Sequence, residues 1–497
     1  MFNFYGSQPT ATKCCRFFLS ILATTLLLNA AIVKADTSDD LAVMPLNKSE
    51  LTEAVNANSQ KNQSLNLNLA KEKSKNAVTA FYADGITLQT ADKENMLAIN
   101  GRVQFDSRHF GGKAAQNTDA FNIRRAYLTA RGTIKKDYDF NVTADFTQQT
   151  NVLDLAYFGI NWFNQAKIRV GQFDMPFGLQ HLTSDLFLEF QERSFNDYLS
   201  PGKERGVMLH GAPIKGVYYN LAASTGRGKN VGNQDNNIDD LDMIARLSTN
   251  LAEVFGQNNS VFHIGVDYAN GDVSPNQAAG SSQLTAGGFT APNLSTEGRG
   301  LAFFTPGKFS TAFTNNPIER TRYGLEAAYA SGPFQIQSER FKQNYTGINS
   351  ANIAFDKDLT AWYISAFWMI TGENLPATYQ PNGTWGRVTP KHDFLPTGTD
   401  TSFGTGAWGI GLRYSEFNAD DFDAGNGPGE ITAGNATTHA QAWTAGVRWM
   451  LNSHTHLVAN YVTTHFDDSL NIKNSAGHIV GSTHHENALT FRAQVDF

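Results

Sequence analysis

The chain has 497 residues, of which 41% are hydrophobic, 17% are charged and 12% are aromatic, and its formal net charge is −7. This composition is too polar for a helical membrane protein and too rich in aromatic residues for a disordered one. The length is compatible with about three ordinary domains or with one large β-barrel.

The N-terminal segment 1–35 has the features of a secretory signal peptide. Lys13 and Arg16 precede a mostly apolar run, 17–33, and Ala35 ends a motif of short side chains at the expected cleavage position. We therefore predict export, with a mature chain that begins at residue 36.

Cleavage after residue 35 would remove both cysteines, since Cys14 and Cys15 lie ahead of the apolar run. The mature chain would then contain no disulfide. Cleavage would also remove three basic residues, Lys13, Arg16 and Lys34, and no acidic one, which changes the formal net charge from −7 to −10. A chain this acidic is not expected to bind nucleic acid.

Residues 36–83 are predicted to form a polar periplasmic leader. The segment is rich in Asn, Ser, Lys and Gln and carries isolated leucines. Some of these leucines fall near helical spacing, but the pattern breaks within two turns. A flexible leader and a short oligomerising helix are both compatible with this pattern.

The dominant signal in the rest of the chain is alternation of apolar and polar side chains with a period of two. The C-terminal segment 487–497 shows it most plainly, with Leu489 and Phe491 on one face and Thr490 and Arg492 on the other. A soluble β-sandwich and an outer-membrane β-barrel can both produce such a pattern, the first with its apolar face inward and the second with its apolar face toward lipid.

Three features favour the membrane barrel: the signal peptide, segments long enough to cross a bilayer as tilted strands, and the terminal Phe497 that closes the last strand. In lipid every backbone polar group must be paired within the protein, so the sheet must close on itself. We predict an all-β fold, a transmembrane antiparallel β-barrel over residues 84–497. Sixteen strands are expected to begin near Met96, Phe121, Asp137, Asn151, Gln165, Lys203, Ile214, Asp240, Ser260, Glu319, Pro333, Asp358, Phe403, His439, His454 and His484.

One connection does not fit the usual pattern of short periplasmic turns and long outer loops. By strand parity the segment 372–402 is periplasmic, yet it is as long as an outer loop. Either the strand count is wrong there, or this turn is an insertion that folds at a specific place.

Several short motifs stand along the predicted barrel: Arg124-Arg125-Ala126-Tyr127 with Gly132, Lys136-Asp137-Tyr138-Asp139-Phe140, Val170-Gly171-Gln172-Phe173, Pro176-Phe177, Leu182-Thr183-Ser184, Glu192-Arg193-Ser194, Thr371-Gly372-Glu373, Gly406-Ala407-Trp408 and Arg413-Tyr414-Ser415. Together they resemble the phosphate-selective porin O and P family over about residues 84–497. The resemblance implies a homotrimeric, sixteen-stranded outer-membrane porin. It also implies two outer loops and a long periplasmic turn that fold into the lumen, which would account for the segment 372–402.

Basic side chains on the polar faces of the strands are candidates for the pore lining. A ladder of such cations could pass an anion along by charge-assisted hydrogen bonds. The alternative is that these cations are simply paired with acidic residues, as in any porin wall. The candidates are Arg102, Arg125, Arg131, Lys167, Arg169, Arg448 and Arg492, with Arg108, Arg246 and Arg413 as further members.

The segment 174–205 is predicted to contain an inward-folded constriction loop, with Asp185, Glu189, Glu192 and Arg193 as its candidate site residues. The segment has six acidic and three basic residues. An anion filter would have the opposite balance at its narrowest point. The balance therefore argues against strong phosphate selectivity.

The predicted function is passive diffusion of small hydrophilic solutes or inorganic ions across the bacterial outer membrane, with phosphate or other anions as candidates. Outer-membrane lipid is the expected surrounding. One alternative is a membrane-embedded hydrolase of the phospholipase kind, but no serine stands in a recognisable nucleophile setting. A non-conducting structural or adhesin barrel is another. No enzymatic activity and no cofactor are expected.

Two further patterns could suggest a metal ion. The segment 235–242 is rich in Asp and Asn but lacks the EF-hand spacing, so we interpret it as a solvated loop. His454 and His456 share a strand face, and His484 and His485 follow nearby, but the expected metal content is none.

Overall fold

The computed structural model describes residues 49, 52–53, 56–65, 77–111, 120–148, 151–226, 228–229, 241–273, 291–309, 318–348, 352–394, 404–473 and 476–497. The chain divides into two compact units, Met1–Glu72 and Lys73–Phe497. Within the first unit, residues 56–65 are helical and exposed. The predicted signal peptide lies outside the described residues. No helix in the described part of the chain is both long and apolar enough to cross a membrane.

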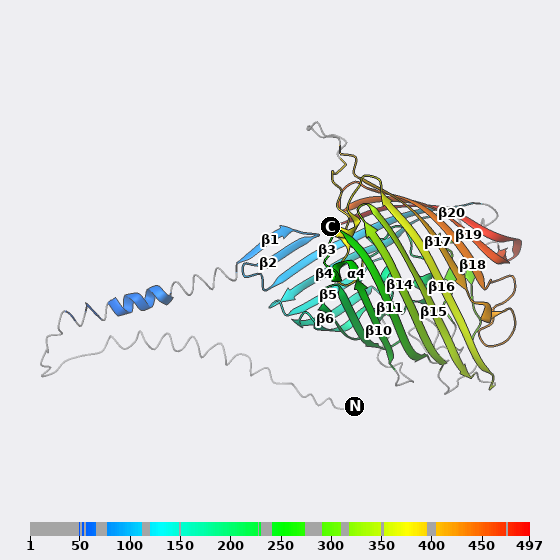
Figure 1. Ribbon diagram of the computed structural model, residues 1–497, viewed down its shortest axis with the longest axis horizontal. Coiled ribbons are helices and arrows are strands. Elements are labelled where there is room, and N and C mark those ends of the chain that lie inside the picture. The colour runs from blue at the N-terminus through cyan, green and yellow to red at the C-terminus, as the bar shows by residue number, and fades with distance from the viewer. Residues whose placement is uncertain are drawn as a thin grey trace, which may run out of the picture. The chain divides into compact units, whose positions relative to one another are not determined.

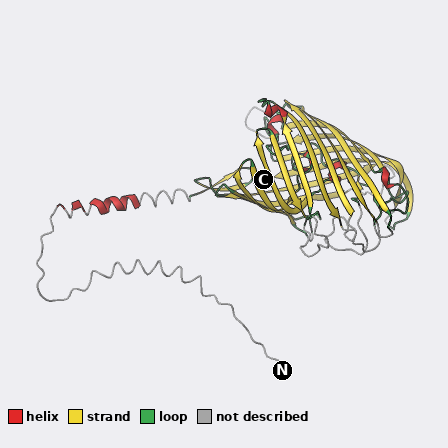
Figure 2. Cartoon of the chain, turned by 60° about the horizontal axis from the view of Figure 1, so that its bottom comes forward, coloured by secondary structure: helices red, strands yellow, loops and turns green. Residues whose placement is uncertain are grey.

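The second unit is a closed barrel of sixteen antiparallel strands, which follow one another around the wall in chain order (Figure 1). The strands are β3 Met96–Gly111, β4 Ala120–Ile134, β5 Tyr138–Asp145, β6 Leu153–Phe163, β7 Ala166–Asp174, β8 Lys203–Ile214, β9 Val217–Ser224, β10 Asp242–Asn250, β11 Ser260–Val273, β14 Ile318–Ser331, β15 Phe334–Ile348, β16 Ala354–Met369, β17 Ala407–Asn418, β18 His439–Met450, β19 Thr455–Lys473 and β20 Ile479–Asp496. All sixteen predicted strands are confirmed. The fold contains little helix (Figure 2).

The barrel closes between its last strand and its first. β20 pairs with β3 from Asn487 opposite Gly111 to Asp496 opposite Arg102. The backbones of Gly101 and Phe497 exchange two hydrogen bonds, of 2.8 and 3.0 Å. A Cβ atom at Gly101 would lie 2.7 Å from the Phe497 ring, so glycine permits this close approach. No sheet edge is left unpaired at the seam.

A hairpin that the alternation did not predict extends the sheet beyond the C-terminus. β1 (Val78–Tyr82) pairs with β2 (Ile86–Thr90). β2 in turn pairs with the first residues of β3, which extend beyond the end of β20. The hairpin therefore crosses the position at residue 83 where we expected the leader to meet the barrel. β1, with the sequence VTAFY, does not alternate strictly, and the alternation of β2, ITLQT, stands apart from the longer alternating segments of the wall.

Burial along the strands is the reverse of that in a soluble protein. On β20 the apolar side chains Leu489 and Phe491 are 41% and 42% exposed, whereas Thr490 and Arg492 are each 3% exposed. Exposed apolar side chains and buried polar ones are expected when the outer face meets lipid and the inner face lines the lumen. This finding establishes a transmembrane barrel and excludes the soluble sandwich.

Both ends of the barrel unit lie at the same end of the wall, because the number of strands is even. Most turns at that end are short, which makes it the periplasmic end. They include the turns at residues 135–137, 164–165, 215–216 and 332–333, while α4 (Leu251–Val254) lies in a longer one. The connections at the opposite, outer end include the segments 175–202 and 419–438 and the described residues 291–309.

Three outer segments fold back and fill much of the outer half of the lumen. Phe303 and Phe304 of the segment 291–309 pack against Phe417 of β17, with ring centroids 5.6 and 5.0 Å apart. Phe303 also contacts Phe195 of the connection that follows β7. The elements of these segments are α3 Leu179–Leu182, η1 Phe195–Leu199, β12 Leu294–Ser295, β13 Ala302–Phe304 and η3 Asp420–Phe422. This aromatic cluster is fully buried and occupies its part of the lumen. The open space of the lumen therefore lies beside other strands.

The long periplasmic connection between β16 and β17, here named the inward turn (370–406), also enters the lumen. It contains η2 (Leu375–Thr378). Trp385 donates from its indole nitrogen to Gln337 on β15 (2.8 Å) and from its backbone to Thr183 (3.2 Å). The implied insertion of this turn into the lumen is confirmed for its described residues.

Candidate functional site

The connection between β7 and β8, residues 175–202, is the constriction loop and is fastened to the barrel wall by buried polar groups. The Glu339 carboxylate on β15 accepts from the backbone nitrogens of Leu179 (2.6 Å) and Gln180 (3.0 Å). On the other side, the Arg448 guanidinium on β18 donates to the carbonyls of Leu186 and Leu188. These buried contacts fix the position of the loop across the lumen.

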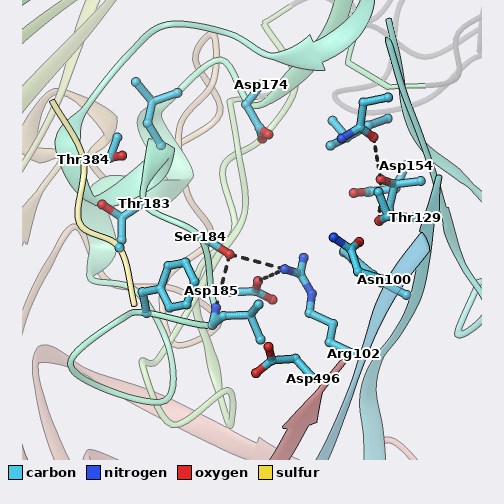
Figure 3. A pocket seen from close by; sticks show the side chains of 18 of the residues that line it. Asn100, Arg102, Thr129, Asp154, Asp174, Thr183, Ser184, Asp185, Thr384 and Asp496 are labelled. Atoms are coloured by element: carbon cyan, nitrogen blue, oxygen red, sulfur yellow. Dashed lines mark hydrogen bonds and ion pairs between the residues drawn. The ribbon is translucent and has the colours of Figure 1, made fainter. Parts of the chain in front are cut away.

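A polar cavity of about 560 Å³ remains between the constriction loop, the inward turn and the wall formed by β3 to β8. Figure 3 shows Asn100, Thr129 and Asp154 on the strands, across the cavity from Thr183 and Thr384. The cavity reaches Asp496 and Phe497 at the periplasmic end. It is the candidate solute path.

The narrow part of this path pairs two wall arginines with one loop carboxylate. Asp185 lies 2.8 Å from Arg102 Nη1 and 2.5 Å from Arg125 Nε. Arg102 also donates to Ser184 Oγ (3.3 Å), as Figure 3 shows. Burial alone would raise the pKa of Asp185, but the two guanidinium groups hold it well below its usual range. Asp185 is therefore ionised at neutral pH.

A β-bulge turns two consecutive arginines toward the lumen. Arg125 pairs with Gln104 and Ile123 pairs with Phe105, so Arg124 has no partner on β3. At this bulge two residues of β4 lie opposite one position of β3. The bulge turns the Arg124 side chain, which strand parity would place on the outer face, toward the lumen. Arg124 reaches the constriction loop from this position.

The Arg124 side chain belongs to a group of four guanidiniums around one carboxylate, Glu192 of the constriction loop. Arg124 Nε and Arg299 Nε lie 3.0 and 2.9 Å from it, and Nη2 atoms of Arg108 and Arg492 lie 3.3 and 2.9 Å from it. Burial raises the pKa of Glu192, but these guanidiniums lower it well below the usual value.

The positive charge of the narrow region exceeds its negative charge. Asp106 is the one further carboxylate bound to this group, through Arg108 (2.7 Å) and Arg492 (2.7 Å). The contact zone between the loop and the wall thus has six guanidiniums, of Arg102, Arg108, Arg124, Arg125, Arg299 and Arg492, against three carboxylates, of Asp106, Asp185 and Glu192. Of these, Arg102, Arg125 and Asp185 line the cavity, and the others lie beside it. The acidic balance of the loop sequence, which argued against anion selectivity, is reversed by the wall.

The other predicted site residues have varied surroundings. Arg131 is exposed and lines the cavity. Arg193 lines the cavity and donates to three backbone carbonyls of the constriction loop itself. Arg169 lies over the Tyr157 ring at 4.2 Å, and Lys167 is paired in register with His210 on β8; neither contributes to the cavity lining. Arg448 and Arg492 are buried supports of the loop.

Sequence reasoning missed two cations beside the path, Arg124 and Arg299, and one that lines it, Arg387. Arg124 was missed because a bulge is not visible in a period of two, although it stands beside Arg125 in the sequence. Arg299 and Arg387 lie outside the regular strands, where parity gives no direction. Arg387 of the inward turn binds Asp496 (2.5 Å) and Asp84 (3.2 Å) at the periplasmic end. Only the folding of these connections into the lumen brings them to the path.

Glu189 of the constriction loop is expected to make the stability of the protein depend on pH. Its carboxylate accepts from Ser365 (2.8 Å) and Gln335 (2.6 Å), but burial raises its pKa to about 7. Stabilisation by a group with a raised pKa is complete below its ordinary value of 4.5 and is lost as the pH rises to about 7. Replacing Glu189 by Gln keeps a neutral side chain, so the variant should gain stability over the wild type across this window, on the order of 2 kcal/mol.

Urea unfolding of detergent-solubilised protein at pH 4 to 8 measures this difference. Glu319→Gln, which removes an exposed carboxylate at the end of β14, is the matched control. A Glu189→Gln difference that stays constant from pH 4 to 8 would contradict the prediction.

The patterns that could suggest a metal ion gain no support. Most of the segment 235–242 lies outside the described residues. His456 Nδ1 accepts from Arg448 (2.9 Å), and His454 contacts Asp496 (3.1 Å). The rings of His465 and His485 stack at 5.7 Å. In the part of the chain that the structure describes, no group of His, Cys, Asp or Glu side chains is arranged to hold a metal ion.

Comparison with known proteins identifies the family. The model of the family "Phosphate-selective porin O and P" matches residues 97–497. The chain belongs to this family. Porin O of Pseudomonas aeruginosa is 26% identical to this porin over 416 residues, which cover 78% of this chain and 87% of that one.

Solved structures with a similar chain path include an anion-selective porin from Comamonas acidovorans, at a TM-score of 0.47 and 10% identity. The match covers 81% of this porin and 100% of that chain. The outer-membrane channel DcaP of Acinetobacter baumannii matches with a TM-score of 0.44 and 12% identity, over 82% of this porin and 99% of that chain.

Family and fold together define the general activity. The chain is a porin of the bacterial outer membrane, with a lumen that allows passive diffusion of small hydrophilic solutes or ions. The constriction loop, the inward turn and the wall beside them line the cavity, so their residues are the candidates that govern passage.

Proposed function

We propose that this porin prefers anions, with phosphate among its solutes. The excess of cations along and beside the path carries this proposal: six basic against five acidic side chains line the cavity, and the Glu192 group next to it adds four guanidiniums against two carboxylates. In a confined lumen of low dielectric surroundings, such an excess attracts anions and repels cations. The family description and the name of the Pseudomonas relative are consistent with it.

Within this proposal the predicted lumen residues have two roles. Arg102, Arg125 and Arg131 line the path and contact the solute, while Arg448 and Arg492 hold the constriction loop in place. Lys167 and Arg169 act at most through the long-range field, because they do not reach the cavity. Asp185, Glu189, Glu192 and Arg193 fix the loop and set its charge.

The reversal potential across a planar bilayer in a KCl gradient tests the proposal. Purified full-length protein should give a reversal potential of the sign set by chloride, and the preference should weaken as the salt concentration rises, because salt screens the fixed charges. A reversal potential of the opposite sign would show cation preference and would refute it. Addition of phosphate should reduce the chloride conductance if phosphate enters the same path.

Export, assembly and the lack of enzymatic activity belong to the same proposal. We infer that residues 1–35 are cleaved during export, that residues 36–83 form a periplasmic leader and that the porin works as a homotrimer in outer-membrane lipid. Neither an enzymatic activity nor a cofactor is required for diffusion through the lumen. Mass spectrometry of the exported protein and its migration as an oligomer before heating test the first and third inferences.

A further inference from the structure

The cavity below the constriction combines cations with apolar side chains, which is unusual for a water-filled lumen. Leu182, Leu186 and Phe187 of the constriction loop line it and are only half-buried. Tyr127 on β4 lines it from the wall side and is also half-buried. The inner face of a porin is ordinarily polar, so partly exposed apolar surface beside arginines needs an explanation.

Aromatic rings support two of the cations. Arg102 lies over the Tyr127 ring at 4.2 Å, and Arg387 lies over the Phe187 ring at 5.3 Å. A guanidinium in this position carries its N–H groups around its rim, and these can meet a planar carboxylate with two parallel hydrogen bonds. The ring beside it remains as an apolar surface for the rest of such a molecule.

The charged side chains of the cavity lining give a small positive excess. Six basic and five acidic side chains line it, so one positive charge is in excess. Arg131 is the exposed cation of the set, and it forms no ion pair with a described residue. This excess attracts an anion but does not separate a carboxylate from phosphate, much of which is also a monoanion at pH 7, so the apolar surface of the lining makes the distinction.

We propose that this cavity binds organic monocarboxylates with an apolar body, of which benzoate is the simplest aromatic member, in preference to inorganic phosphate. The inference rests on the proposed anion preference and adds the solute class. The carboxylate pairs with Arg131 and the rim of Arg102, and the apolar body lies against Tyr127, Leu182 and Phe187. The cavity volume of about 560 Å³ is within the range of small-molecule sites, about 300–1,000 Å³.

Blocking of the chloride current tests this proposal. The full-length porin is inserted into planar bilayers in KCl at pH 7, and sodium benzoate, acetate or phosphate is titrated into the periplasmic-side chamber. Benzoate should halve the conductance at a concentration about fivefold or more below that of acetate or phosphate. Equal or stronger block by phosphate would overturn the proposal, and so would equal block by acetate, since acetate has the charge without the apolar body.

Two variants separate the apolar contact from general damage. Phe187→Ala should raise the half-blocking concentration of benzoate about fivefold, as expected for the loss of one aromatic contact, and should change that of acetate little. Phe121→Ala removes an 86% exposed ring on β4 that does not line the cavity and should change neither value. Unheated electrophoretic mobility verifies that each variant is folded. An unchanged benzoate value in folded Phe187→Ala would refute the assigned site.

Failure of this inference can be told apart from failure of the proposed function. A wild-type protein that prefers potassium over chloride in a KCl gradient refutes the anion preference itself. A protein that prefers chloride but is blocked equally by benzoate, acetate and phosphate retains the anion preference and refutes the solute class alone.

Discussion

Replacing Arg246 on β10 by Met is expected to lower the free energy of unfolding by about 3–5 kcal/mol. The Arg246 side chain is fully buried and donates to both oxygens of Glu326, at 2.8 and 2.7 Å. Asp267, also fully buried, lies 3.7 Å away. The substitution would remove the cation from the buried Glu326 carboxylate and leave His263 (2.7 Å) and Asp267 as its polar neighbours. Burial of uncompensated charge is the cause of the large effect.

The same substitution should also alter the conducting path. Arg246 donates to the backbone carbonyls of Asn382 (3.0 Å) and Gly383 (3.1 Å) in the inward turn. Without these bonds the turn is expected to be held less firmly in the lumen, so single-channel conductance should rise and become noisier. Urea unfolding in detergent, followed by tryptophan fluorescence, measures the stability loss. Arg131→Met, which removes an exposed arginine, is the matched control and should cost less than about 1 kcal/mol.

A loss below 1 kcal/mol for Arg246→Met would mean that the two carboxylates find other partners or take up protons at little cost. A normal loss of stability with unchanged conductance would instead show that the inward turn is held by its other contacts, such as those of Trp385.

Replacing Asp185 by Asn is expected to raise the ratio of anion to cation permeability about thirtyfold in 0.1 M salt. At an effective dielectric constant of about 20, a unit charge about 8 Å from a permeating ion changes its energy by about 2 kcal/mol, and screening at 0.1 M reduces this by roughly half. The remaining energy of about 1 kcal/mol is gained by the anion and lost by the cation, so the ratio changes by about 2 kcal/mol, or about thirtyfold. Reversal potentials in a KCl gradient measure the ratio.

The opposite substitution provides the control for this effect. Arg131→Gln, on the facing wall of the same cavity, should lower the ratio by a similar factor. Both effects should largely disappear in 1 M salt, where the Debye length is about 3 Å. If Asp185→Asn leaves the ratio unchanged at low salt, the field at the narrow part is not set by the Asp185 carboxylate.

Much of the barrel could be predicted because its main determinant is local. Each strand must present apolar side chains to lipid and polar ones to the lumen, so apolar and polar residues alternate in its sequence, as in 487–497. The hairpin β1–β2 was not predicted because β1 does not alternate strictly and the alternation of β2 covers only its five residues. The length of the inward turn indicated a specific fold, but its partners on β10 and β15 could not be known without the inter-strand register.

The candidate site was predicted only in part. Arg102 and Arg125 were expected in the lumen because parity holds along their strands. Arg124 was not, since a bulge after Gln104 changes the parity of β4. The sign of the charge at the narrow part was also misread, because the acidic loop was counted by itself. Its carboxylates Asp185 and Glu192 meet arginines from distant strands, and the sum is positive.

The amino-acid sequence alone determined that this protein is a sixteen-stranded outer-membrane barrel, because alternation, turn residues and strand length are properties of neighbouring residues, and the loop folded into its lumen was implied by the resemblance to the porin family. Only the tertiary structure decided the charge of the path, the four guanidiniums around Glu192 and the apolar lining beside Arg102 and Arg387. Those features depend on which side chains meet across the lumen. These side chains are brought together by barrel closure, by one bulge and by two inserted connections. None of these features can be predicted from the sequence of a single strand.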